Sequence, residues 1–286
     1  LSTNPDNSAS QIYDLIIKKG ACDTMPTLVH VYNSGAEFKI GDYTVGNKAN
    51  VHIYDSATLK ASDGGLLYLD QYSKIYVHDG GKLDIAANGK LQSIWNAQII
   101  VEDGGIRSGG ILETRDNSII HVKTGGQMII ESGADIRLWD GNLPVDGEAT
   151  IRISGELVLK GGFLFSGNGY FQFDQGNTLT QEVPFALKGV QSSVRMLRMN
   201  SNAQLNINDQ GIFLRQGRVD YMGNASIALQ QNAMLAADTC GFVGSGIGNV
   251  DIAIDANNAK RISIDSCTFS GWIQKSGGQR DPVFRQ

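Results

Sequence analysis

Proline and cysteine are both scarce in this sequence, which has 5 prolines and 3 cysteines among 286 residues, although 35 residues are glycine. Disordered and collagen-like chains are rich in proline as well as glycine, and small disulfide scaffolds need far more cysteine. The composition therefore argues against these classes of chain. Since 41% of the residues are hydrophobic, the chain has enough apolar side chains to bury a core.

Clustered positive charge and long apolar runs are lacking as well. The formal net charge is -5 at pH 7. Because binding to phosphates requires clustered lysine and arginine, we expect neither a nucleic acid nor an anionic membrane surface as a partner. No apolar stretch approaches the roughly 18 to 20 residues of a membrane span, so we expect no transmembrane segment. The first residue is leucine rather than methionine, and we expect the chain to be part of a larger chain or assembly.

The sequence does contain a repeat of short alternating segments, each closed by Gly, Asn, Asp or Ser, which is typical of strands and turns. Three segments align without gaps at offsets of 24 and 24 residues: Val51–Asp55, Ile75–Asp79 and Ile99–Asp103. Two further segments begin at Ile120 and Ile151, after offsets of 21 and 31 residues. Self-similarity over tens of residues indicates a solenoid or a propeller.

A period near 24 residues favours a parallel β-solenoid, because a propeller blade needs about 40 or more residues. The apolar ladder of Val51, Ile75 and Ile99 then points inward. Glycine and asparagine turn the corners because both tolerate a positive φ, and proline is scarce because interior strands must donate hydrogen bonds to their neighbours. We expect one repeating domain of about ten coils over residues 28–275.

Open coil ends expose unpaired strand edges, so we expect the repeat to be capped. Residues 1–27 are predicted to form an N-terminal cap segment with a short helix over Ser10–Lys19, where the apolar side chains follow helical spacing. The competing interpretation is a first strand over Tyr13–Ile17. Residues 276–286 are predicted to form a C-terminal tail, truncated from a longer chain.

A second pair of segments carries a resemblance to a known family. Asp238–Gly244 recurs as Asp265–Gly271 at an offset of 27 residues, directly after the alternating Ile262–Ile264. This pattern resembles the coils of right-handed parallel β-helix proteins of the pectate-lyase-like superfamily, many of which are secreted bacterial or phage proteins. The glycine pairs Gly80–Gly81 and Gly125–Gly126 are similar to the turns of bacterial secreted and surface adhesin-like β-helix repeats.

The resemblance implies an all-β chain that forms a single-stranded, right-handed parallel β-helix. It also implies an extracellular or cell-surface location, in a bacterium or a phage, and a structural or adhesin-like role. One fold hosts many activities, so what the chain binds has to be inferred from its side chains.

Cys240 and Cys267 occupy equivalent places in adjacent coils. Such a pair forms a disulfide, a metal-binding pair or an inward stack of small buried thiols. We expect the stack, because it fits the register without any bond between the sulfur atoms. No pairing is predicted for Cys22.

Asp55, Asp79 and Asp103 follow one another at identical offsets, which places their carboxylates one above another at a corner of the coil. Calcium would neutralise such a column, since it prefers oxygen ligands. The alternative is that each aspartate only caps the backbone of its own turn. We expect no cofactor, and we keep calcium at these three residues as the one metal hypothesis.

The outward positions of the aligned strands form two columns on one lateral face. The first column is His52, Tyr76, Ile100, His121 and Arg152, and the second is Tyr54, His78, Glu102, Lys123 and Ser154. Aromatic rings can stack on sugars and imidazole can hydrogen-bond. We therefore predict a face that recognises a polysaccharide or a cell-surface protein. Its predicted ligand-binding residues are His52, Tyr54, Tyr76, His78, Glu102 and His121. The alternative is an ordinary sheet surface whose side chains only pair across strands.

A polysaccharide lyase or glycoside hydrolase of the β-helix type is the alternative function. Such enzymes use paired carboxylates, or an acidic calcium site with an arginine or lysine base. The sequence has no Asp-Asp pair and no Gly-His-Gly, Gly-x-Ser-x-Gly or His-Glu-x-x-His motif. We therefore assign no catalytic residue and favour an extracellular structural or adhesin-like module.

Overall fold

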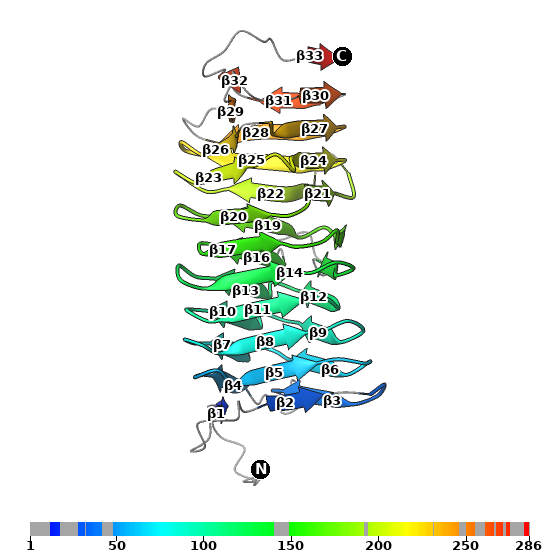
Figure 1. The fold of residues 1–286 in the computed structure, drawn as a ribbon, viewed down its shortest axis with the longest axis vertical. Helices are drawn as coiled ribbons and strands as arrows, with labels where there is room; N and C mark the ends of the chain where they lie inside the picture. The colour runs from blue at the N-terminus through cyan, green and yellow to red at the C-terminus, as the bar shows by residue number, and fades with distance from the viewer. Residues whose placement is uncertain are drawn as a thin grey trace.

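The structure is a computed structural model, and it describes residues 12–17, 28–31, 33–41, 48–139, 149–191, 194–230, 232–245, 250–254, 261–265, 267–270, 273–274 and 283–285. Every helix or strand in these ranges is a β-strand. Strands three places apart along the chain pair in parallel, so the chain winds into a solenoid with three faces. Figure 1 shows the strands stacked along one rod, from β1 (Ile12–Ile17) at one end to β33 (Val283–Arg285) at the other.

The first face is one 11-stranded sheet, here called sheet A. It contains β1, β4 (Lys48–Ile53), β7 (Lys74–Val77), β10 (Gln98–Val101), β13 (Ile119–Val122), β16 (Thr150–Ile153), β19 (Tyr170–Phe173), β22 (Arg195–Met199), β25 (Arg218–Met222), β28 (Gly241–Ser245) and β31 (Thr268–Ser270).

The second face begins as a seven-stranded sheet, here called sheet B, and continues as a four-stranded sheet. Sheet B contains β2 (Leu28–Val31), β5 (Thr58–Ala61), β8 (Lys82–Ile85), β11 (Gly105–Ser108), β14 (Gln127–Ile130), β17 (Glu156–Leu159) and β20 (Thr178–Gln181). The continuation contains β23 (Gln204–Ile207), β26 (Ser226–Leu229), β29 (Val250–Ile254) and β32 (Ile273–Gln274).

The third face is likewise built from two sheets, of six and five strands. The six-stranded sheet C contains β3 (Glu37–Ile40), β6 (Leu66–Leu69), β9 (Lys90–Ser93), β12 (Ile111–Arg115), β15 (Asp135–Trp139) and β18 (Leu164–Gly167). The five-stranded sheet contains β21 (Phe185–Lys188), β24 (Ile212–Arg215), β27 (Met234–Asp238), β30 (Arg261–Asp265) and β33.

The register of sheet A confirms the aligned repeat. Val51 pairs with Ile75, Ile75 with Ile99, and Ile99 with Ile120. All four side chains are buried in the core, as predicted. The solenoid has about 8 turns, from β4 to β27, rather than the ten expected.

The helix predicted over Ser10–Lys19 is wrong, because Ile12–Ile17 forms strand β1 and pairs in parallel with β4. The physical reason is that a strand at the end of the rod gives the backbone groups of β4 hydrogen-bond partners, which a helix cannot do. Ile17 pairs with Ile53 and is buried. At the other end, Val283–Arg285 of the predicted tail forms β33 and pairs with β30.

The two later cysteines lie in neighbouring coils as reduced thiols, with Cys240 buried and Cys267 partly buried, which agrees with the predicted stack. The backbone N–H of Cys240 lies 3.4 Å from Sγ of Cys267 and donates to it. The hydrogen bond with Cys267, together with burial, raises the pKa of the Cys240 thiol. A buried thiol of this kind is an unreactive packing group. Cys22 lies outside the described residues.

Candidate functional site

The outward face of sheet A brings the predicted binding residues together. His52 pairs in register with Tyr76, Tyr76 with Ile100, and Ile100 with His121. All members of the predicted set are half-buried, so each offers part of its side chain to solvent: His52, Tyr54, Tyr76, His78, Glu102 and His121. The placement of the two columns is therefore correct, and ligand binding at them stays a prediction.

Four aromatic rings on this face lie in nearly parallel planes. Tyr54 stacks on His78 with ring centroids 4.0 Å apart and 3° between the planes. His52 stacks on Tyr76 at 4.7 Å and 6°. Because the partners come from successive coils, the ring faces cover one another along the rod and the ring edges point outward. The face of each ring that is covered in this way is not available for stacking on a sugar.

A chain of hydrogen bonds runs along the same face. Nδ1 of His78 lies 2.8 Å from Oε2 of Glu102, and Nζ of Lys123 donates to Oε1 of Glu102 at 2.8 Å. Since an ionised carboxylate only accepts, Nδ1 of His78 is the donor in the first bond. In a neutral ring, Nε2 of His78 then accepts from Nδ1 of His52, which lies 3.0 Å away. The bond from Lys123 lowers the pKa of Glu102.

Asp174, at the end of β19, is a functional candidate that the sequence reasoning missed. Its Oδ2 accepts from Nε of Arg152 at 2.5 Å and from Oγ of Ser154 at 2.7 Å. Its Oδ1 accepts from Nδ2 of Asn200 at 2.6 Å and from Nε2 of Gln172 at 3.2 Å. Burial opposes ionisation, but the bonds from Arg152, Ser154 and Asn200 outweigh it and lower the pKa of Asp174.

His121 joins the two parts of this face. Its Nε2 lies 3.2 Å from Oγ of Ser154, which in turn donates to Asp174. Burial, together with the charge of Arg152, lowers the pKa of His121. The signal that would have revealed Asp174 is its position, because it follows Phe173 as Ser154 follows Ile153 in the neighbouring strand.

The three aspartates proposed for calcium are exposed at the corner that follows sheet A. Asp55 has a φ of 49°, which is typical of a tight turn, and its backbone N–H donates to the carbonyl of Asp79 at 3.0 Å. Among the described residues, no group of three or more His, Cys, Asp or Glu side chains has the arrangement of a metal site. Calcium at Asp55, Asp79 and Asp103 stays an untested prediction.

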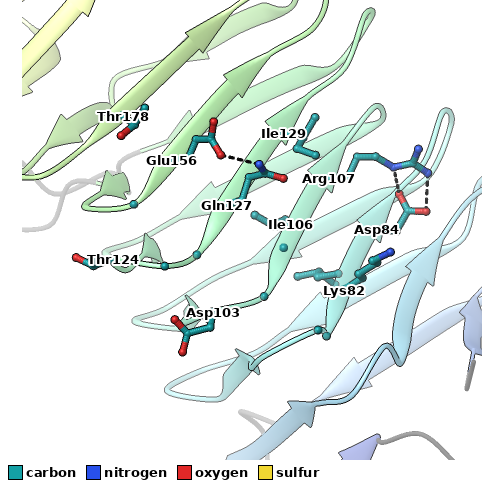
Figure 2. A pocket seen from close by; sticks show the side chains of 18 of the residues that line it. Lys82, Asp84, Asp103, Ile106, Arg107, Thr124, Gln127, Ile129, Glu156 and Thr178 are labelled. Carbon is teal, nitrogen blue, oxygen red and sulfur yellow. Dashed lines mark hydrogen bonds and ion pairs between the residues drawn. The ribbon is translucent and has the colours of Figure 1, made fainter.

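An open groove lies beside this corner and crosses the strands of sheet B. It has a volume of about 950 Å³ and is lined by corner glycines and by outward side chains of β5 through β20. Figure 2 shows the polar side chains along it, with Lys82 on β8 and Gln127, Glu156 and Thr178 on the successive strands β14, β17 and β20. This groove was not predicted from the sequence, and it lies where corner glycines precede the strands of sheet B.

The polar groups of the groove are held by one another. Nε and Nη2 of Arg107 donate to the two carboxylate oxygens of Asp84 at 2.9 and 2.8 Å. Nε2 of Gln127 donates to Glu156 at 2.7 Å, and Oγ1 of Thr180 donates to its other oxygen at 2.8 Å. The first two of these contacts form a charge-assisted, bidentate pair, which fixes the orientation of both side chains.

Comparison with known proteins adds little. No protein family and no curated protein matches the chain. Among solved structures, it is similar to the crystal structure of a TibC-catalysed, hyper-glycosylated fragment of TibA, with 14% identity over 93% of this chain and 97% of that chain and a TM-score of 0.26. Agreement at that level carries no functional argument, so the assignment as a parallel β-solenoid rests on the strand pairing. In the described ranges, the structure has no helix that is long and apolar enough to cross a membrane.

Proposed function

We propose that this β-solenoid is an extracellular or cell-surface recognition module that binds a polysaccharide through the outward face of sheet A. The observation that supports this most directly is the block of four rings formed by His52, Tyr54, Tyr76 and His78, whose planes are nearly parallel and whose edges face solvent. The hydroxyl groups of Tyr54 and Tyr76 make no hydrogen bond to any described residue, so both are open to a ligand.

Recognition here uses ring edges rather than ring faces. Tyrosine hydroxyls both donate and accept hydrogen bonds, and so do the hydroxyls of a sugar. Each ring is already held by the ring in the next coil, and His78 is also held by Glu102. Side chains that are ordered before binding lose little conformational freedom on binding, which favours affinity.

The test is a double variant, Tyr54→Phe with Tyr76→Phe, which keeps both ring stacks and removes only the outward hydroxyls. Tyr68→Phe, on sheet C, is the matched control. Binding to a panel of neutral and acidic polysaccharides is measured by isothermal titration calorimetry. We expect the double variant to lose about tenfold in affinity, since two net hydrogen bonds are removed. The control and the thermal unfolding midpoint should stay unchanged.

Two results would overturn the proposal. If the double variant binds as well as the unmodified chain, these hydroxyls do not contact the ligand. If the unmodified chain binds none of the polysaccharides but binds a purified cell-surface protein, the ligand class is wrong. The same incubations, with and without calcium, also test the catalytic alternative, because release of shortened products would indicate a lyase or a hydrolase.

A further inference from the structure

We infer that the groove of sheet B is a second binding site, for a linear uncharged oligosaccharide that lies along the rod, and that Gly105 keeps its floor open. This site is separate from the ring block of sheet A and does not depend on the function proposed for that face. The argument starts from one column of sheet B. The outward residues at the start of its strands pair in the order Thr58, Lys82, Gly105, Gln127, Glu156 and Thr178.

Gly105 alone in this column has no side chain, and packing does not demand a glycine there. A Cβ atom at Gly105 would meet nothing closer than the carbonyl oxygen of Gln127 at 4.0 Å, and its φ lies outside the left-handed region. The preceding Gly104 differs, because a Cβ there would lie 2.4 Å from the carbonyl oxygen of His78. The stacking of coils therefore requires glycine at position 104 but not at position 105.

Gly105 is the first residue of β11. A strand glycine that packing does not require is one of the features that mark close approach of a ligand to the backbone. At Gly105 the missing side chain leaves a gap between Lys82 and Gln127, the neighbours in the column. That gap lies within the groove of about 950 Å³. Gly105 therefore opens the floor over which a ligand can pass from one coil to the next.

The charges that line the groove favour an uncharged ligand. Three cationic and four carboxylate side chains line it: Lys82, Arg107, Lys160, Asp84, Asp103, Glu131 and Glu156. Arg107 and Asp84 neutralise each other, so no strong field of one sign is left to attract a polyanion or a polycation. The groove is lined by hydrogen-bond donors, such as Lys82 and Gln127, and by acceptors, such as Glu156, and a sugar hydroxyl can bond to either kind.

An extended peptide fits the groove less well. Peptides that add to a sheet need a free strand edge, and apolar segments need apolar pockets. The strands under the centre of the groove, β8, β11 and β14, are paired on both sides. Ile129 is the one outward apolar side chain among the described lining residues. The groove crosses the strands of five successive levels above β5, a length of about 24 Å at the usual strand spacing, which accommodates several sugar units.

The test fills the groove without disturbing the coils. Gly105→Leu places a side chain on the groove floor. Gly162→Leu is the matched control, because a Cβ atom at Gly162 meets nothing within 4 Å and Gly162 does not line the groove. Binding of cello-, manno- and xylo-oligosaccharides is measured by isothermal titration calorimetry, with polygalacturonate fragments as the acidic comparison.

We expect the unmodified chain and Gly162→Leu to bind at least one neutral oligosaccharide, and Gly105→Leu to bind it about tenfold or more weakly at an unchanged unfolding midpoint. The Tyr54→Phe, Tyr76→Phe variant should retain this binding, which separates the two sites. Equal binding by Gly105→Leu would overturn the inference. So would an unmodified chain that binds only the acidic fragments or none of these sugars.

Discussion

The outward faces of sheets A and B are built from the same kind of short strand, yet they are filled in opposite ways. On sheet A, side chains of successive coils touch along the rod, with rings stacked on rings and Asp174 surrounded by four donors. On sheet B, the column of outward side chains is interrupted at Gly105 and a groove opens beside it.

This difference shows that a solenoid can make a surface in two ways. Where each side chain contacts the same position in the next coil, the face becomes a rigid array of preordered groups. Where one coil omits its side chain, the face becomes a concave site without any change in the backbone. Stability measurements on variants of the filled face and of the neighbouring glycine corner can test this difference.

The largest effect is expected at the corner itself, in Gly104→Ala. The new methyl group would lie 2.4 Å from a backbone carbonyl oxygen of the previous coil, so backbone must shift to accept it. We expect a loss of about 3 kcal/mol in the free energy of unfolding, as for other overpacked sites. Chemical denaturation followed by circular dichroism measures it.

Gly105→Ala is the control for that variant, one residue away. It introduces the same methyl group into open space at a φ outside the left-handed region. We expect it to stabilise the chain by about 0.4 to 1 kcal/mol, because alanine restricts the unfolded chain more than glycine does. Equal losses in both variants would mean that the corner and the groove floor do not differ in packing.

The next largest effect is expected for Asp174→Ala on sheet A. It removes the acceptor of four hydrogen bonds and leaves the guanidinium of Arg152 without its carboxylate partner. We expect a loss of about 2 kcal/mol, in the range of hydrogen bonds to charged groups.

Asp135→Ala provides the comparison, since Asp135 pairs with Arg137 on the surface of sheet C. Such a partly exposed surface pair contributes about 1 kcal/mol or less. Thermal unfolding of the two variants, each against the unmodified chain, gives the difference. If both variants lose the same stability, Asp174 is not the centre of a network.

A smaller effect is expected from mild acid. The pKa of His121 lies below its ordinary value of 6.5, because burial disfavours the charged ring. A histidine whose pKa is lowered by folding binds its proton more readily in the unfolded chain. Its contribution to stability is therefore complete above about pH 6.5 and is lost as the pH falls from there through the lower pKa of the folded chain. Glu102 and Asp174 also have lowered pKa values, so their contributions are lost only as the pH falls below 4.5 and 3.8.

We therefore expect the unfolding midpoint to decrease in two stages on acidification, which calorimetry across this pH range measures. His121→Gln keeps a neutral polar side chain and should weaken the first stage only. A first stage of unchanged size in that variant would assign it to another group.

Some features of the fold and of the candidate site could be predicted from the sequence, and others could not. The inward ladder of Val51, Ile75 and Ile99 and the outward placement of His52 and Tyr76 follow from the 24-residue offset and from alternation, so both were predictable. Strand β1 was mispredicted as a helix, because its pairing with β4 outweighs local spacing. Asp174 was missed because irregular offsets hide which residue stands above Ser154.

The solenoid follows from the sequence, because the strand period, the glycine corners and the scarcity of proline all describe one repeating coil. The chemistry of the surface, in contrast, follows from contacts between coils. Alternation places a side chain on the outside, but whether a ring lies flat or stands on edge depends on the ring in the next coil, as for Tyr54 and His78. Likewise, Gly104 and Gly105 are the same residue type and neighbours in the sequence. Only the packing of adjacent coils shows that a side chain cannot fit at position 104 and can fit at position 105.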